Sequence, residues 1–129
     1  MGDMKREVVL PAGGANPIGP YSPGIRANGF VFASGAIGVD PAIGALVQGG
    51  VEAETRQALH NLSRVLEAGG SSLGQVVKTT VFLLDMDEFA KMNQVYAGFF
   101  SEEPPARSTI QVAALPGGAS VEIEAIAIT

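Results

Sequence analysis

Apolar residues recur at helical spacing in two segments of this chain, residues 51–68 and 86–100. In the first segment they follow the 3.6-residue period on one face, at Ala58, Leu59, Leu62, Val65 and Leu66. Gly69 and Gly70 come directly afterwards, and glycine commonly ends a helix. The second segment carries its large apolar side chains in one stripe, at Phe89, Met92, Tyr96, Phe99 and Phe100. The spacing therefore predicts two amphipathic helices.

Shorter apolar runs, bounded by glycine, proline and polar residues, predict strands. These runs cover residues 30–34, 76–84, 108–115 and 121–128. Residues 11–24 are rich in glycine and proline and predict an ordered loop or a short edge segment, while residues 40–44 have the composition of a hairpin turn. Strands arranged around two helices predict one α+β domain over residues 1–129, with both helices on one face of a sheet.

Two of the predicted strands are apolar on both faces. Strict alternation in residues 76–84 places Val77, Val81 and Leu83 on one face and Val76, Phe82 and Leu84 on the other. Residues 121–128 place Val121, Ile123, Ala125 and Ala127 opposite Ile126 and Ile128. Two helices cover only one face, and an open antiparallel sheet normally presents a polar second face to water. The simplest cover is another copy of the chain, so we expect a homo-oligomer with sites between subunits.

Composition and charge exclude several classes of functional site and binding partner. The chain has 129 residues, no cysteine and one histidine, which removes disulfides, zinc–thiolate sites and thiol nucleophiles. We expect no metal site and interpret His60 as a surface or packing residue. With a net charge of −5, the chain lacks the excess of basic residues that is typical of a general nucleic-acid-binding protein. We also expect no targeting segment, no membrane contact and a cytoplasmic location.

The candidate chemistry starts at Arg107, which follows Pro104 and Pro105 at the beginning of a predicted strand. Two prolines stiffen the approach, and a guanidinium held in this way is preorganised to bind a carboxylate through two parallel hydrogen bonds. Glu122 alternates into an otherwise apolar strand, where a charge needs a partner or an open cavity. One interpretation is an anion site with a carboxylate that handles water or a proton. The other is an Arg107–Glu122 ion pair that only closes a sheet edge.

Four further residues are candidates for the same site. Asn93 interrupts the apolar stripe of the second helix, so its amide either contacts a ligand or braces a neighbouring loop. Ser34 ends a predicted strand, and Gly35 after it allows close approach of the backbone to a ligand, although an ordinary turn explains both residues equally. Tyr21 follows Gly19-Pro20 and is either a pocket wall or a core residue.

Several short motifs occur together, in one order, along nearly the whole chain. They are Ile18-Gly19-Pro20-Tyr21, Ala33-Ser34-Gly35, Asp40-Pro41, Val77-Lys78-Thr79-Thr80-Val81-Phe82, Met92-Asn93 with Tyr96, Pro105-Ala106-Arg107-Ser108, and Val121-Glu122-Ile123-Glu124-Ala125-Ile126-Ala127. In these motifs the chain resembles the RidA/YjgF family of reactive-intermediate (enamine/imine) deaminases. The same group is also known as the endoribonuclease L-PSP or translation initiation inhibitor family.

The resemblance implies a chorismate-mutase-like α+β fold with a mixed, mainly antiparallel sheet, and a homotrimer with clefts at its subunit interfaces. It implies that Arg107 binds a substrate carboxylate and Glu122 holds the attacking water. Tyr21, Ser34 and Asn93 would line the cleft, and backbone groups at Gly35 and Thr109 would orient the ligand. Many members have cysteine where this chain has Thr109, a change that a backbone role would tolerate.

The implied activity is that of a 2-iminobutanoate/2-iminopropanoate deaminase, a hydrolase acting on C=N bonds. It would convert 2-aminoacrylate or 2-iminobutyrate to a 2-keto acid and ammonia, removing a reactive metabolite without a cofactor. Two alternatives remain at this point. One is an endoribonuclease that inhibits translation, and the other is a non-catalytic protein that binds 2-keto acids or similar metabolites through Arg107.

Overall fold

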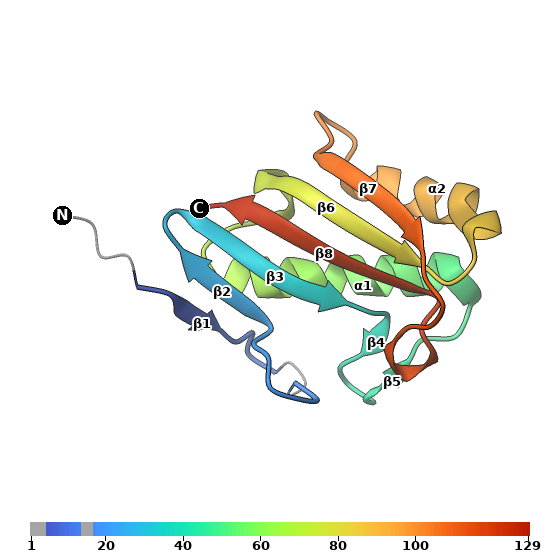
Figure 1. The fold of residues 1–129 in the computed structure, drawn as a ribbon, viewed down its shortest axis with the longest axis horizontal. Helices are drawn as coiled ribbons and strands as arrows, with labels where there is room; N and C mark the ends of the chain where they lie inside the picture. Colours follow the sequence, from blue (N-terminus) through green and yellow to red (C-terminus); the bar gives the residue numbers. More distant parts are fainter. Residues whose placement is uncertain (1–4, 14–16) are drawn as a thin grey trace.

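Six strands form one sheet in the order β1-β2-β3-β8-β6-β7 in the computed structural model, which describes residues 5–13 and 17–129 (Figure 1). The strands are β1 (Glu7–Val9), β2 (Gly24–Ala27), β3 (Phe30–Ala36), β6 (Val76–Leu83), β7 (Ala106–Gln111) and β8 (Val121–Ile128). Neighbours run antiparallel, except for β6 and β7, which are parallel. The expected mixed, mainly antiparallel sheet is confirmed.

The predicted turn at residues 40–44 joins a separate hairpin of two short strands, β4 (Val39–Asp40) and β5 (Ala45–Leu46). The Asp40 carboxylate accepts a hydrogen bond from the backbone N–H of Ala42 at 2.9 Å, as expected of an aspartate that opens a turn.

Both long helices lie behind the sheet in Figure 1, as the sequence predicts. Helix α1 spans Gly50–Ala68, and helix α2 spans Phe89–Phe99. The second helix begins later than expected, because Met86–Glu88 forms a separate 3-10 turn (η2) whose start is capped by the Asp85 side chain. Two further 3-10 turns, η1 (Leu73–Gln75) and η3 (Pro116–Gly118), lead into β6 and β8.

The Gly69-Gly70 pair ends α1 as predicted. Gly70 has a φ of 84°, in the left-handed region, and its N–H donates to the carbonyl of Glu67. The next N–H, of Ser71, donates to the carbonyl of Leu66 at 2.8 Å. This pair of bonds is a Schellman motif, which satisfies the last carbonyls of the helix and turns the chain toward β6.

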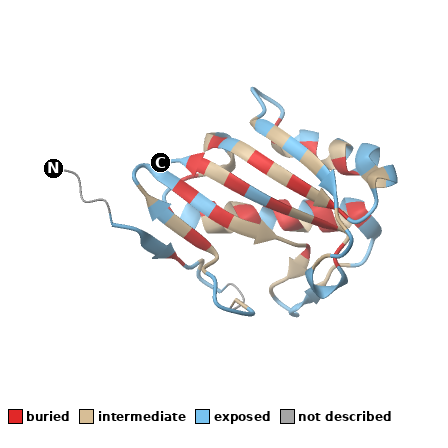
Figure 2. Ribbon diagram, viewed as in Figure 1, coloured by how far each residue is buried: buried red, intermediate tan, exposed pale blue. Residues whose placement is uncertain are grey.

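The core lies between α1 and the sheet. Leu59, Leu62 and Leu66 on α1 are fully buried against helix-facing strand residues such as Val31 and Ile123. In Figure 2 buried and exposed positions alternate along β3 and β8, so each strand places every second side chain in this core.

The predicted strands differ from the structure in several details, and β1 and β2 were not predicted. The pairing of β6 with β8 shifts between Val76 and Lys78, so a bulge breaks the alternation there. Val76 is therefore buried and Val77 exposed, the reverse of the faces expected from strict alternation. In addition, β7 ends at Gln111 rather than at residue 115, because its partner β6 ends at Leu83, which is paired with Gln111.

The sheet face away from the helices is open in the single chain and carries several large apolar side chains. Phe32 is 43% exposed and Ile110 is 44% exposed, and both belong to this face. Val8, Phe30 and Ile128 extend the same surface across β1, β3 and β8. Among the described residues, no helix is long and apolar enough to cross a membrane.

The buried helix–sheet contact predicts the outcome of a core truncation. Leu62→Ala removes a fully buried side chain and leaves a cavity, so we expect it to lower the free energy of unfolding by roughly 2–5 kcal/mol. Ile43→Ala, at a side chain that is 69% exposed, should change it by less than about 0.5 kcal/mol. Urea unfolding followed by circular dichroism at one protein concentration measures both, and equal losses would contradict this assignment of the core.

Candidate functional site

Arg107 lies on β7 and points toward the helices. In the parallel register it is paired with Thr79, which is fully buried on the helix side of β6. Its guanidinium carbon lies 4.7 Å from the ring centroid of Tyr96 and 5.6 Å from that of Phe89, both on α2. Cation–π contacts of this kind hold the charge in place and leave its N–H donors available. Within the described part of the chain, no carboxylate forms an ion pair with Arg107.

Asn93 and Thr109 lie on the same side of the sheet as Arg107. Asn93 follows Phe89 by four residues and precedes Tyr96 by three, so it shares the helix face that carries both aromatic contacts. Its Oδ1 atom is buried and accepts no hydrogen bond in the described chain. Thr109 is two residues beyond Arg107, opposite Val81. We call Arg107, Asn93 and Thr109 the arginine cluster.

Glu122 occupies the opposite face, at the beginning of β8. It is paired with Phe82, and it shares its face with Glu124. Burial raises the pKa of Glu122 above its ordinary value, and the negative charge of Glu124 raises it further. A carboxyl group with a raised pKa is suited to accept and return a proton near neutral pH.

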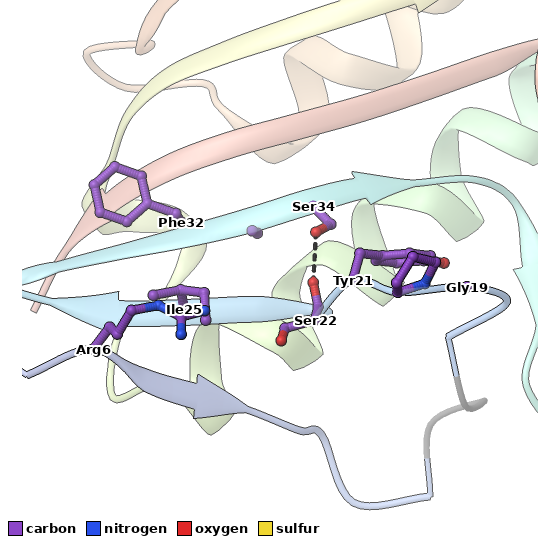
Figure 3. A pocket seen from close by; sticks show the side chains of 9 residues that line it. Arg6, Gly19, Tyr21, Ser22, Ile25, Phe32 and Ser34 are labelled. Atoms are coloured by element: carbon purple, nitrogen blue, oxygen red, sulfur yellow. Dashed lines mark hydrogen bonds between the residues drawn. The ribbon is translucent and has the colours of Figure 1, made fainter.

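Gly35 makes room for the Glu122 carboxylate. The pairing of β3 with β8 gains one residue between Ala33 and Ala36, so Ser34 and Gly35 lie in a β-bulge beside Glu122. A Cβ atom at position 35 would overlap the Glu122 carboxylate, which explains why glycine is needed there. The Ser34 hydroxyl donates to the backbone carbonyl of Ser22 at 2.6 Å, fixing the bulge to the preceding loop (Figure 3).

Tyr21 lies in that loop and is 54% exposed. It lines two neighbouring cavities, of about 530 and 330 Å³, and Ser34 lines both of them with it. Figure 3 shows the larger cavity, in which Phe32 and Ser34 come from β3 and Tyr21 and Ser22 from the loop before β2. Gly35 lines the smaller cavity. We call Glu122, Gly35, Ser34 and Tyr21 the carboxylate cluster.

The two clusters do not meet within one chain. Arg107 and Glu122 lie on strands separated by β6, three register positions apart, and on opposite faces of the sheet. With about 4.8 Å between strands and about 3.3 Å per residue, their Cα atoms are roughly 14 Å apart. The alternative of an intrachain Arg107–Glu122 ion pair is therefore wrong.

The surroundings of Arg107 contain functional candidates that sequence reasoning did not assign. Tyr96 and Phe89 were placed on a helix stripe without a role, and Thr79 is one residue of a strand motif. The Thr79 Oγ1 and Tyr96 hydroxyl oxygens are 2.7 Å apart in the buried interior. The sequence feature that could have identified these candidates is an asparagine between two aromatic residues on one helix face. It does not indicate which strand that face contacts.

The described residues contain no group of three or more His, Cys, Asp or Glu side chains arranged to hold a metal ion. His60 is exposed and makes an edge-on contact with Phe99, with ring centroids 5.2 Å apart, which confirms its interpretation as a surface and packing residue.

The profile of the endoribonuclease L-PSP family matches residues 13–129. A RutC family protein of Pyrococcus horikoshii is 48% identical over 122 residues, covering 95% of this chain and 97% of that protein. The mouse protein named 2-iminobutanoate/2-iminopropanoate deaminase is 45% identical over 128 residues, covering 99% and 95%. Among solved structures, E. coli TdcF with bound serine superposes with a TM-score of 0.88 at 38% identity, covering 95% of this chain and 98% of that one.

The raised pKa of Glu122 predicts how stability depends on pH. A carboxyl group whose pKa rises on folding favours the folded state at low pH and loses this contribution as pH rises through its folded-state pKa. Glu122→Gln should therefore raise the free energy of unfolding at pH 7, and the gain should vanish below the ordinary carboxyl pKa. Thermal unfolding at both pH values measures this change. The exposed Glu102, changed to Gln, is the control, and an equal pH-dependent gain there would contradict the argument.

Proposed function

Because the chain belongs to the endoribonuclease L-PSP family, the Rid proteins, we propose that it hydrolyses reactive 2-enamine and 2-imine intermediates to 2-keto acids and ammonia. The substrates would be of the 2-aminoacrylate and 2-iminobutyrate class, and the activity that of a 2-iminobutanoate/2-iminopropanoate deaminase in the cytoplasm. The observation that carries the proposal is a guanidinium within cation–π distance of the Tyr96 and Phe89 rings, with no carboxylate partner among the described residues.

Arg107 is proposed as the carboxylate anchor. A 2-imino acid presents a planar carboxylate beside an electrophilic C=N carbon, and a guanidinium binds such a carboxylate through two parallel hydrogen bonds. Fixing the carboxylate also fixes the carbon next to it relative to a nearby water. The buried, unpartnered Oδ1 of Asn93 supports a contact with the imine N–H or an ordered water, because an acceptor at that position needs a donor.

Glu122 is proposed to hold and activate the water. The water adds to the C=N carbon, and one of its protons passes through the carboxylate to nitrogen, which gives a carbinolamine. The remaining hydroxyl proton then passes to the same nitrogen as the C–N bond breaks, so that ammonia leaves and the carbon becomes the carbonyl of the 2-keto acid. The raised pKa of Glu122 supports both halves of this proton relay. Because the imine carbon is already electrophilic, the reaction needs no cofactor, in agreement with a chain that has no cysteine and one histidine.

The assembly follows from the separation of the two clusters. A ligand of a few atoms cannot reach Arg107 and Glu122 of one chain, so the proposed site combines the arginine cluster of one subunit with the carboxylate cluster of another. The open apolar face with Phe32 and Ile110 supports burial against further copies. We therefore propose a homotrimer with one composite cleft at each interface.

Imine hydrolysis tests the activity directly. We generate 2-iminobutyrate in situ and compare its loss with wild type, Arg107→Ala and the exposed-site control Arg56→Ala. Losing a charged hydrogen-bonding anchor should lower kcat/KM by roughly tenfold to hundredfold, whereas the control should match wild type. No acceleration by wild type over solvent hydrolysis would rule out the deaminase. If wild type then still bound 2-ketobutyrate, the binding-protein alternative would replace it.

Subunit complementation tests the composite cleft. Arg107→Ala and Glu122→Gln should each keep at most about a tenth of wild-type activity alone. In equal co-expression, about a quarter of interfaces should combine the intact arginine of one subunit with the intact glutamate of another, and about that share of wild-type activity should return. Light scattering of wild type should give about three times the mass of one chain. A mixture no more active than its components would mean that the two residues do not act across an interface.

A further inference from the structure

Of the two aromatic rings beside the Arg107 guanidinium, that of Tyr96 is the closer, and the Tyr96 side chain has further contacts that restrict its movement. Its exposed fraction is only 5%, and its hydroxyl lies 2.7 Å from the Thr79 Oγ1 atom. Phe100 packs against the ring with centroids 4.6 Å apart. A ring with a fixed hydroxyl and a packed second neighbour has little freedom to move, so the surface that it presents to Arg107 is rigid.

The strand register strengthens this arrangement. Thr79 and Arg107 are direct partners on the parallel strands β6 and β7, and their side chains leave the same face of the sheet. The Tyr96 side chain, coming from α2, contacts both of them. Each of the three residues therefore contacts the other two. The hydrogen bond to Thr79 sets the position of the Tyr96 ring relative to the Arg107 backbone.

The electrostatics agree with this contact. Burial raises the pKa of Tyr96, while the hydrogen bond with Thr79, the positive charge of Arg107 and a hydrogen bond with Arg107 lower it in part. The phenol thus remains a neutral hydrogen-bonding group near pH 7, and the negative face of its ring is directed at the cation. A neutral ring holds the guanidinium without neutralising it, which an aspartate or glutamate in the same place would do.

We propose that Tyr96 is a positioning residue, whose ring, braced by Thr79, fixes the Arg107 guanidinium in the orientation that receives the substrate carboxylate. This inference rests on the proposed function of Arg107. An arginine side chain without such a contact samples many rotamers, and restricting it to one rotamer when a ligand binds costs conformational entropy. Stacking on Tyr96 restricts these rotamers before the substrate arrives, so the ring contributes to catalysis through Arg107 without touching the substrate.

A double-mutant cycle distinguishes this role from ordinary core packing. Tyr96→Leu removes the ring and should lower kcat/KM for 2-iminobutyrate about tenfold, with the larger part in KM. In an Arg107→Ala background the same change should have no further effect, because the group that the ring positions is absent. Tyr96→Phe keeps the ring and loses only the brace to Thr79, so its kcat/KM should lie between those of Tyr96→Leu and wild type. Equal losses in both backgrounds, or equal losses for Leu and Phe, would overturn the proposal.

Phe99→Leu is the matched control, since it truncates another partly buried aromatic residue of α2 that contacts His60 rather than Arg107. It should leave kcat/KM unchanged in both backgrounds. A loss as large as that of Tyr96→Leu would assign the effect to general packing of α2 and would count against positioning.

A second measurement needs neither turnover nor a ligand. The chain has two tyrosines and no tryptophan, so Tyr21→Phe leaves Tyr96 as the single tyrosine. Adding Arg107→Ala to that variant should raise the pKa of Tyr96, followed by the ultraviolet absorbance of tyrosinate. An unchanged pKa would overturn the contact on which the proposal depends. Failure of the proposed deaminase activity would instead appear as inactive wild type with this shift intact.

Discussion

The alternation of side chains along a strand is the constraint on which the proposed site depends. It directs Arg107 toward the helices and Glu122 toward the open face, with β6 between their strands. Backbone hydrogen bonds to both neighbours of β6 make this separation a property of the whole sheet, which no rotamer change can remove. A reaction that needs both side chains at one small ligand must therefore take them from two subunits. The separation of the two clusters therefore follows from the geometry of the sheet.

The two clusters deal differently with the cost of partly burying a charge. The Arg107 guanidinium lies over two aromatic faces, which stabilise the cation while leaving its N–H groups available. Burial raises the pKa of Glu122, and the second carboxylate on its face, Glu124, raises it further. The first cluster keeps a fixed charge ready for an anion, and the second keeps a carboxyl group that exchanges its proton easily. These are complementary requirements of a hydrolysis that anchors one end of a substrate and activates water at the other.

The sequence predicted the helices and the main strands, because hydrophobic periodicity records burial directly. Helix α1 and strand β8 follow their predicted bounds closely. The bulge at Val77 was missed because alternation assumes an unbroken ladder, and nothing in a run of valines marks an extra residue. The contact of Tyr96 with Arg107 was missed for another reason. It depends on how α2 lies over β7, which is set by tertiary packing and not by local pattern.

In the proposed cleft the charge of the substrate links the two clusters. A free Arg107 near the partner's Glu122 would favour the ionised carboxylate and offset part of the rise in its pKa. When a substrate carboxylate pairs with the guanidinium, that positive charge is compensated and the influence weakens. Glu122 then returns toward the raised pKa set by its burial and by Glu124, and becomes a stronger base when a water has to be activated. Substrate binding at one subunit's arginine would in this way increase the basicity of the other subunit's glutamate, with no movement of the backbone.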